Sequence, residues 1–190
     1  MATLSASAYV VLGLLREWGP ATPYALDRTI RQSIGHFWVF PRSQLYAEAA
    51  RLVRLGLVAE EQEDSGRRRR LLSLTPAGAA EFGTWLATPT QEPTEIRDAG
   101  LLRLFFHAPG SADADAVLAL AQEQGKAHRR KLAEYDRIAA AAHMSADTPQ
   151  AAALELGLRF ERMAIAYWDE ITAGGSRAVT SSWAGGDSGA

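Results

Sequence analysis

The sequence predicts a mainly α-helical chain of the α+β class, with one β-hairpin in its N-terminal half and an all-helical second domain. Three observations support this prediction. Apolar residues recur at helical spacing through most of the 190 residues. Two short extended runs, 57–61 and 71–74, flank a polar segment that contains glycine, as the strands of a hairpin do. Residues 88–94, Thr-Pro-Thr-Gln-Glu-Pro-Thr, have the composition of a linker.

The first two helices are predicted from their apolar faces and their caps. Apolar residues at positions 8, 11, 12 and 15 form one face of a helix from Ser5 to Trp18, and Gly19-Pro20 ends it. Thr22 can cap a second helix that begins at Pro23 and buries Leu26 and Ile30.

A third helix, the hairpin and a fourth helix complete the N-terminal domain. The third helix runs from Pro41 to about Leu55, with Gly56 after its last turn. The hairpin tip is residues 63–70, and Thr75-Pro76 opens a fourth helix through Trp85-Leu86. This order is that of a winged helix-turn-helix with a two-stranded wing, which we expect over residues 1–88.

Beyond a linker at 89–94, residues 95–173 are predicted to form a helical dimerisation domain, and 174–190 a disordered tail. Helices are expected at 95–106, 113–142 and 150–172. The long middle helix carries a stripe at the alternating spacing of three and four residues found in coiled coils. We assign this stripe to the dimer interface, with packing inside one subunit as the alternative; its residues are Leu118, Ala121, Gly125, His128, Leu132 and Tyr135.

Composition restricts the class of protein. Apolar residues make up 47% and charged residues 22%, as in soluble globular proteins, and the absence of cysteine excludes disulfides and thiolate metal sites. No signal-peptide pattern or membrane-length apolar run occurs, so we expect a cytoplasmic protein. Residues 1–88 hold 10 Lys and Arg against 8 Asp and Glu (+2), whereas 89–190 hold 10 against 14 (−4).

The third helix and the hairpin tip carry the chemistry of DNA recognition. At the start of the helix, Arg42 can bind guanine and Gln44 adenine, each through two hydrogen bonds, with Ser43 between them. Ordinary helix-start composition is the alternative. The run Arg67, Arg68, Arg69 and Arg70 supplies permanent cations for phosphates, with Arg67 and Arg68 nearest the tip. A solvated turn that keeps the hairpin soluble is the alternative here.

Enzyme chemistry has little support in the sequence. The four histidines are scattered without the i, i+4 spacing of a zinc site, and no phosphate-binding or nucleophile motif occurs. We therefore expect no catalysis, no metal and no cofactor.

Five segments in order make the chain resemble the PadR family of regulators, in the longer form with a helical C-terminal domain of the Vir group. They are Tyr9–Leu15, Gly35–Trp38 with Ser43–Tyr46, Leu52–Val58, Leu74–Gly78, and Ile96–Asp98 with Leu101–Phe106. The chain departs from the family in having Pro41 at the cap of the third helix, Pro23 before Tyr24, and Leu72 in the second wing strand. The first departure alters the helix end that would meet the bases, so the family's usual operator is not transferred.

The resemblance implies a homodimeric repressor that binds a pseudo-palindromic operator in double-stranded DNA and is released by a small aromatic or apolar effector. It adds Tyr24 and Tyr46 to the DNA-binding set, although Tyr46 could equally pack against the second helix. It also implies an effector cavity between the two domains, for which core packing is the alternative assignment; the candidate residues are Tyr9, Trp38, Phe105, Phe106 and Trp168. The alternative function is a winged-helix interaction module that binds a partner protein through its C-terminal helices.

Overall fold

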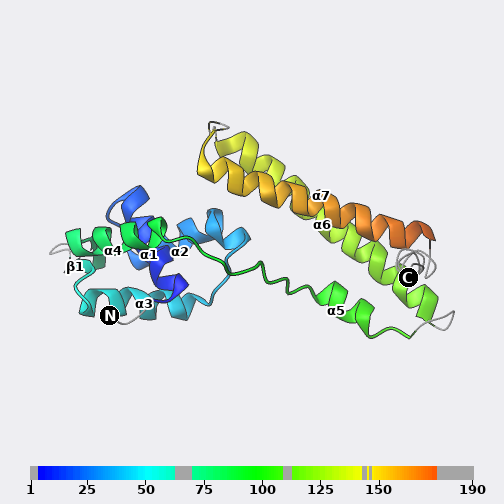
Figure 1. Cartoon of the computed structure of the whole chain (residues 1–190), viewed down its shortest axis with the longest axis horizontal. Coiled ribbons are helices and arrows are strands. Elements are labelled where there is room, and N and C mark those ends of the chain that lie inside the picture. The colour runs from blue at the N-terminus through cyan, green and yellow to red at the C-terminus, as the bar shows by residue number, and fades with distance from the viewer. Residues whose placement is uncertain (1–3, 63–69, 109–112, 143–144, 146, 175–190) are drawn as a thin grey trace, which may run out of the picture. The chain divides into compact units, whose positions relative to one another are not determined.

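The computed structural model describes residues 4–62, 70–108, 113–142, 145 and 147–174. The chain divides into two compact units, Met1–Pro93 and Thr94–Ala190, and each is described by itself. The predicted fold class is confirmed, because the first unit combines helices with a two-stranded antiparallel sheet and the second unit is helical (Figure 1). Within the described ranges, no helix has both the length and the apolar character needed to cross a membrane.

Helix α1 (Ala6–Trp18) lies at the centre of the N-terminal unit, and α2 (Pro23–Gln32) follows it. The predicted apolar face of α1 is buried, and Ser5 caps the helix by accepting a hydrogen bond from the amide of Ala8. Thr22 caps α2 through the amide of Ala25. A 3₁₀ turn, η1 (Ile34–His36), follows α2.

Helix α3 (Arg42–Arg54) buries Leu45, Ala49 and Leu52, and α4 (Pro76–Ala87) begins after the capping residue Thr75. Pro41 stands at the cap of α3 and makes no side-chain hydrogen bond there. Gly78 in α4 allows a close approach of two backbones, because a Cβ at this position would lie 2.0 Å from the carbonyl oxygen of Leu57.

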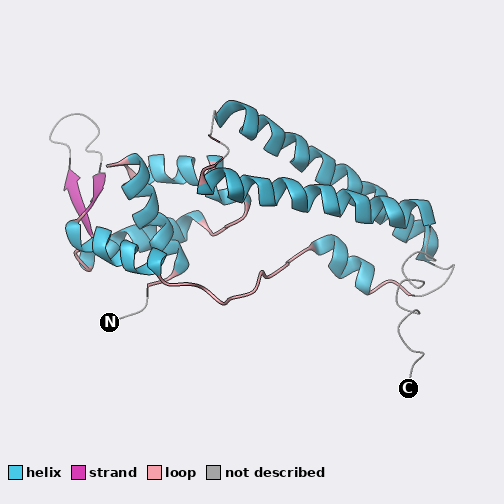
Figure 2. Cartoon of the chain, turned by 45° about the horizontal axis from the view of Figure 1, so that its top comes forward, coloured by secondary structure: helices cyan, strands magenta, loops and turns pink. Residues whose placement is uncertain are grey.

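The hairpin consists of β1 (Val58–Gln62) and β2 (Arg70–Leu74), drawn in magenta in Figure 2. The register of the two strands places Glu60 opposite Leu72. A third segment, which sequence analysis missed, forms a β-bridge with this hairpin. Ala21, in the loop between α1 and α2, exchanges two backbone hydrogen bonds with Leu72, of 2.9 and 3.0 Å. The base of the hairpin is therefore joined to the segment that leads into α2.

The C-terminal unit contains α5 (Ala99–Phe105), α6 (Ala114–Ala142) and α7 (Pro149–Gly174). Helix α5 begins later than the sequence predicts, because the Asp98 carboxylate accepts hydrogen bonds from the amides of Gly100 and Leu101 and so caps the helix there. Helices α6 and α7 lie side by side in antiparallel directions in Figures 1 and 2. Their core is a cluster of Ala121, Trp168 and Ile171.

Several residues of the dimer stripe predicted on α6 contact α7 of the same chain, which is the packing inside one subunit given as the alternative. Ala121 belongs to the α6–α7 core. His128 Nδ1 lies 2.6 Å from a carboxylate oxygen of Glu161, and Tyr135 packs on Gly157. Leu118 and Leu132 are half-buried, and Gly125 is buried. A spacing of three and four residues specifies an apolar face but does not specify which helix covers it.

Candidate nucleic-acid interface

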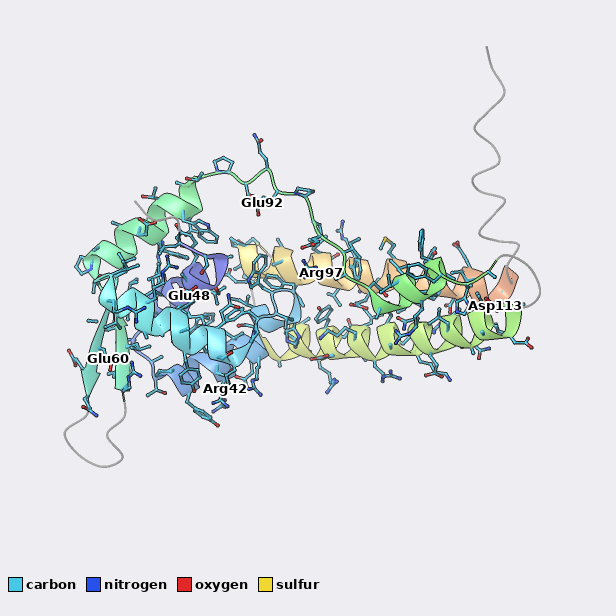
Figure 3. The ribbon with its side chains drawn as sticks, turned by 90° about the horizontal axis from the view of Figure 1, so that it is seen from below. Arg42, Glu48, Glu60, Glu92, Arg97 and Asp113 are labelled. Atoms are coloured by element: carbon cyan, nitrogen blue, oxygen red, sulfur yellow. The ribbon has the colours of Figure 1, made fainter. Side chains whose placement is uncertain are left out.

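The start of α3 presents one arginine held by side chains from two helices. The Arg42 guanidinium donates a hydrogen bond from Nη2 to the Tyr46 hydroxyl at 3.2 Å, and its Nε lies 3.5 Å from Asp27 Oδ2. Its central carbon also lies 5.9 Å from the centre of the Tyr24 ring and 5.6 Å from that of the Tyr46 ring. We call Tyr24, Asp27, Arg42 and Tyr46 the arginine cluster, and Figure 3 labels Arg42.

The side chains around Arg42 favour its positively charged form. The hydrogen bond to Tyr46, together with the negative charge of Asp27, raises the pKa of Arg42 above its ordinary value, so the guanidinium stays cationic. Asp27 is only 9% exposed, and its Oδ2 also accepts a hydrogen bond from Arg31 at 2.9 Å. Sequence analysis missed Asp27, although its position one turn before Arg31 indicates a paired carboxylate.

The remaining predicted residues of α3 divide between two surroundings. Ser43 is exposed, as are Tyr24 and Tyr46 in the arginine cluster. The Gln44 side-chain amide instead donates a hydrogen bond to the Ser7 hydroxyl of α1 at 2.8 Å. One turn further on, Glu48 accepts a hydrogen bond from Ser5 at 2.6 Å. Gln44 and Glu48 thus connect α3 to the start of α1.

Of the four predicted wing arginines, the structure describes Arg70. Arg67, Arg68 and Arg69 lie outside the described residues. Arg70 begins β2 and forms a two-point ion pair with Glu60 of β1, with Nε–Oε1 and Nη2–Oε2 distances of 2.7 and 2.5 Å. This hydrogen bonding holds the pKa of Glu60 below its ordinary value. Arg70 therefore has a partner inside the hairpin (Figure 3 labels Glu60).

The candidate effector residues of the N-terminal unit, Tyr9 and Trp38, have different surroundings. The Tyr9 ring is buried and stacks on Trp85 with ring centres 4.7 Å apart, and its hydroxyl donates a hydrogen bond to Glu81 at 2.9 Å. Burial, together with that bond, raises the pKa of Tyr9. Trp38 is half-exposed and lines a hollow of about 240 Å³ beside Ser7 and Gln44.

In the C-terminal unit, the three remaining candidates also have different surroundings. Trp168 is 1% exposed in the α6–α7 core. Phe105 is exposed, and Phe106 lines an open hollow of about 610 Å³ with Leu102, Arg103 and His107. Trp168 therefore has the packing role that was the alternative assignment, and Phe106 is the member that borders a hollow.

Helix α7 carries an apolar surface that sequence analysis missed. Leu156, Phe160, Met163 and Tyr167 are 69%, 38%, 59% and 38% exposed. Their spacing of four, three and four residues puts them along one line of the helix, which we call the α7 stripe. The same spacing rule that selected residues of α6 would have found this stripe.

Comparisons with known proteins match both units. Residues 11–84 match the model of the transcriptional regulator PadR-like family, and residues 96–173 match that of the virulence activator alpha C-terminal domain. A curated relative, the negative transcriptional regulator PadR of Bacillus subtilis (strain 168), is 28% identical over 100 residues. That match covers 52% of this chain and 54% of the relative, so it spans about half the length of each.

Solved structures match over most of the chain. Bacillus subtilis PadR in complex with operator DNA has a TM-score of 0.76 at 24% identity and covers 89% of this chain and 98% of its own. The same protein in complex with p-coumaric acid has a TM-score of 0.70 at 23% identity, over 87% and 96%. The Vibrio cholerae virulence activator AphA has a TM-score of 0.68 at 27% identity, over 89% and 97%.

Proposed function

This chain belongs to the PadR-like family of transcriptional regulators, and we propose that it is a homodimeric repressor that binds a pseudo-palindromic operator in double-stranded DNA. The arginine cluster carries the proposal. A permanent cation with a planar fork of donors stands at the exposed start of α3, between two exposed tyrosines. In a helix-turn-helix, the N-terminal end of the recognition helix, here α3, enters the major groove.

The proposed contacts divide into two kinds. Arg42 reads a guanine, with Ser43 beside it, while Tyr24 and Tyr46 flank it towards the phosphates. Arg67 and Arg68, with Arg69, bind phosphates without regard to sequence. Arg70 is paired with Glu60 inside the hairpin, and the Gln44 amide is hydrogen-bonded to α1. Neither residue is therefore assigned to DNA. The PadR structure with operator DNA supports DNA as the ligand class.

We assign the homodimer contact to the α7 stripe in place of the α6 residues. An exposed line of large apolar side chains at coiled-coil spacing is a surface that a second copy of the same helix can cover. A two-fold dimer would carry two α3 helices, which read half-sites about 34 Å apart, or one turn of DNA.

Release by a small aromatic or apolar effector is also part of the proposal, supported by the PadR structure with p-coumaric acid. The hollow beside Leu102 and Phe106 in the C-terminal unit offers apolar contacts, with Arg103 near by. An effector that favours a dimer of different half-site spacing would weaken DNA binding by its differential affinity for the two shapes.

The test is selection of binding sites from random duplex DNA, followed by titrations of the selected duplex at several salt concentrations. We expect a palindromic site and a log–log salt slope of about −0.9 per phosphate contacted. Arg42→Ala is expected to reduce the preference at one base pair per half-site by about 10-fold. Arg67→Ala with Arg68→Ala is expected to flatten the slope and weaken binding to all sequences alike.

Arg162→Ala is the matched control, because it removes an exposed arginine that lies on α7 and not among the proposed DNA contacts. It should leave both the base preference and the salt slope unchanged. If the wild-type chain shows no salt-sensitive duplex binding, the repressor assignment is wrong, and the α7 stripe becomes a surface for a different protein. If the double arginine variant keeps the wild-type slope, the wing assignment is wrong.

A further inference from the structure

Asp27 occupies an unusual position for a carboxylate, since it lies on α2 with little exposure while both of its cationic partners reach solvent. Its side chain is 12% exposed, whereas those of Arg31 and Arg42 are 66% and 49% exposed. Removing a carboxylate from water is costly unless charged donors replace the lost water. Here the two donors come from different helices, so Asp27 links α2 to α3.

The link constrains the arginine on α3. A free arginine side chain samples many rotamers, and ordering it when a ligand binds reduces the affinity. Arg42 already has three restraints in the protein alone: Asp27 at Nε, the Tyr46 hydroxyl at Nη2, and the rings of the two tyrosines.

These restraints use only part of the hydrogen-bonding capacity of the Arg42 guanidinium, whose side chain is 49% exposed. The contacts that Arg42 makes with other described residues use Nε and one hydrogen of Nη2. Both hydrogens of Nη1 and the second hydrogen of Nη2 therefore remain, and two parallel donors on neighbouring nitrogens are what a guanine O6 and N7 pair requires.

We propose that Asp27 is a positioning residue that sets the sequence preference of this protein by orienting Arg42 before DNA binds. This inference rests on the proposed function, because it presumes that Arg42 reads a base. Asp27 itself touches no DNA. Its removal is therefore expected to act on base discrimination through Arg42, and to leave the phosphate contacts as they are.

The test is a double-mutant cycle on the selected duplex and on a duplex altered at the base pair read by Arg42. Asp27→Asn keeps the shape of the side chain and removes its charge. We expect it to reduce the discrimination between the two duplexes by about 3-fold to 10-fold, the effect of one long side chain left to be ordered on binding. In a chain that already carries Arg42→Ala, Asp27→Asn should change the discrimination no further.

Arg31→Ala is the control, because it removes the other partner of Asp27 and leaves the Arg42 contact in place. It should retain the wild-type discrimination. Equal weakening of both duplexes by Asp27→Asn, or an undiminished effect of Asp27→Asn in the Arg42→Ala chain, would overturn the proposal. These outcomes differ from a failure of the proposed function, in which the wild-type chain itself does not bind duplex DNA.

A second measurement needs neither DNA nor a substitution that could unfold the chain. Relaxation of the arginine Nε–Hε groups in the wild-type protein reports how ordered each side chain is on the fast timescale. Arg42 should be close to backbone rigidity, while Arg54, exposed at the other end of α3, should be mobile. Equal mobility of Arg42 and Arg54 would contradict the orienting role of Asp27, whatever the chain binds.

Discussion

The N-terminal and C-terminal units enclose their apolar residues to different extents. In the N-terminal unit, buried side chains from α1, α2, α3, both strands and α4 form one cluster, in which Leu12, Leu52 and Leu72 have no exposed surface. The exposed large apolar residues of this unit include the short segment Phe37–Val39, the pair Trp85 and Leu86, and single positions elsewhere. Several layers of helix and sheet therefore close a core within one chain.

Fewer secondary-structure elements enclose the core of the C-terminal unit. Its central cluster is Ala121, Trp168 and Ile171, with half-buried neighbours from α5 and α6. The two long antiparallel helices cover one face of each other, and the α7 stripe lies on a part of α7 that is exposed within this chain. The first unit thus closes its core with its own elements, while the second unit leaves a line of large apolar side chains on α7 exposed within this chain.

The largest expected effect that separates the units comes from Trp168→Ala. Truncation of a fully buried tryptophan costs about 3–5 kcal/mol, and the small C-terminal core has few other contacts to compensate. In calorimetry, we expect the C-terminal transition to disappear or to move far down in temperature, while the N-terminal transition stays. Trp18→Ala, at an exposed tryptophan of α1, is the matched control and should change stability by less than about 0.5 kcal/mol.

A second, smaller effect is expected from Met163→Glu at the centre of the α7 stripe. A buried interface anchor is worth about 2 kcal/mol, and a two-fold dimer contains the substitution twice, so dimer dissociation should become at least about 100-fold easier. Analytical ultracentrifugation would measure this shift. Ala166→Glu adds the same charge at an exposed position about a quarter turn from the stripe and should preserve the dimer. A Met163→Glu dimer as tight as the wild type would show that α7 is not the contact.

The smallest effect is expected from Thr75→Ala, in the N-terminal unit. Its hydroxyl accepts a hydrogen bond from the Gly78 amide at 3.0 Å and donates one to the Gly56 carbonyl at 2.8 Å. Loss of this cap should cost about 1 kcal/mol, seen as a lower melting temperature of the N-terminal transition alone. Thr84→Ala, which removes only a bond to the Ala80 carbonyl within the helix, should have a smaller effect. A shift of the C-terminal transition would contradict this expectation.

Sequence patterns predicted the local features well, because these depend on nearby residues. The caps at Thr22 and Thr75 follow from a hydroxyl residue before proline, and the hairpin follows from two extended runs around a polar turn. The start of α5 was predicted too early, because the apolar pattern gave no weight to the Asp98 cap.

Features that depend on distant residues could not be predicted in this way. The amide of Gln44 has the chemistry to read adenine, yet Ser7, 37 residues earlier, accepts its hydrogen bond. The pairing of Asp27 with Arg42 and the covering of His128 by Glu161 likewise require knowledge of which helices meet. One sequence shows which faces are apolar or charged, but the topology decides their partners.

The two hydrogen bonds between Ala21 and Leu72 have a mechanical consequence. Ala21 stands two residues before α2, which carries Tyr24 and Asp27, while Leu72 is the middle residue of β2. A force on the hairpin that displaced Leu72 would stretch these two hydrogen bonds and would also displace the segment that leads into α2. Because these backbone hydrogen bonds join the hairpin to the segment before α2, we expect the two elements to open as one cooperative unit.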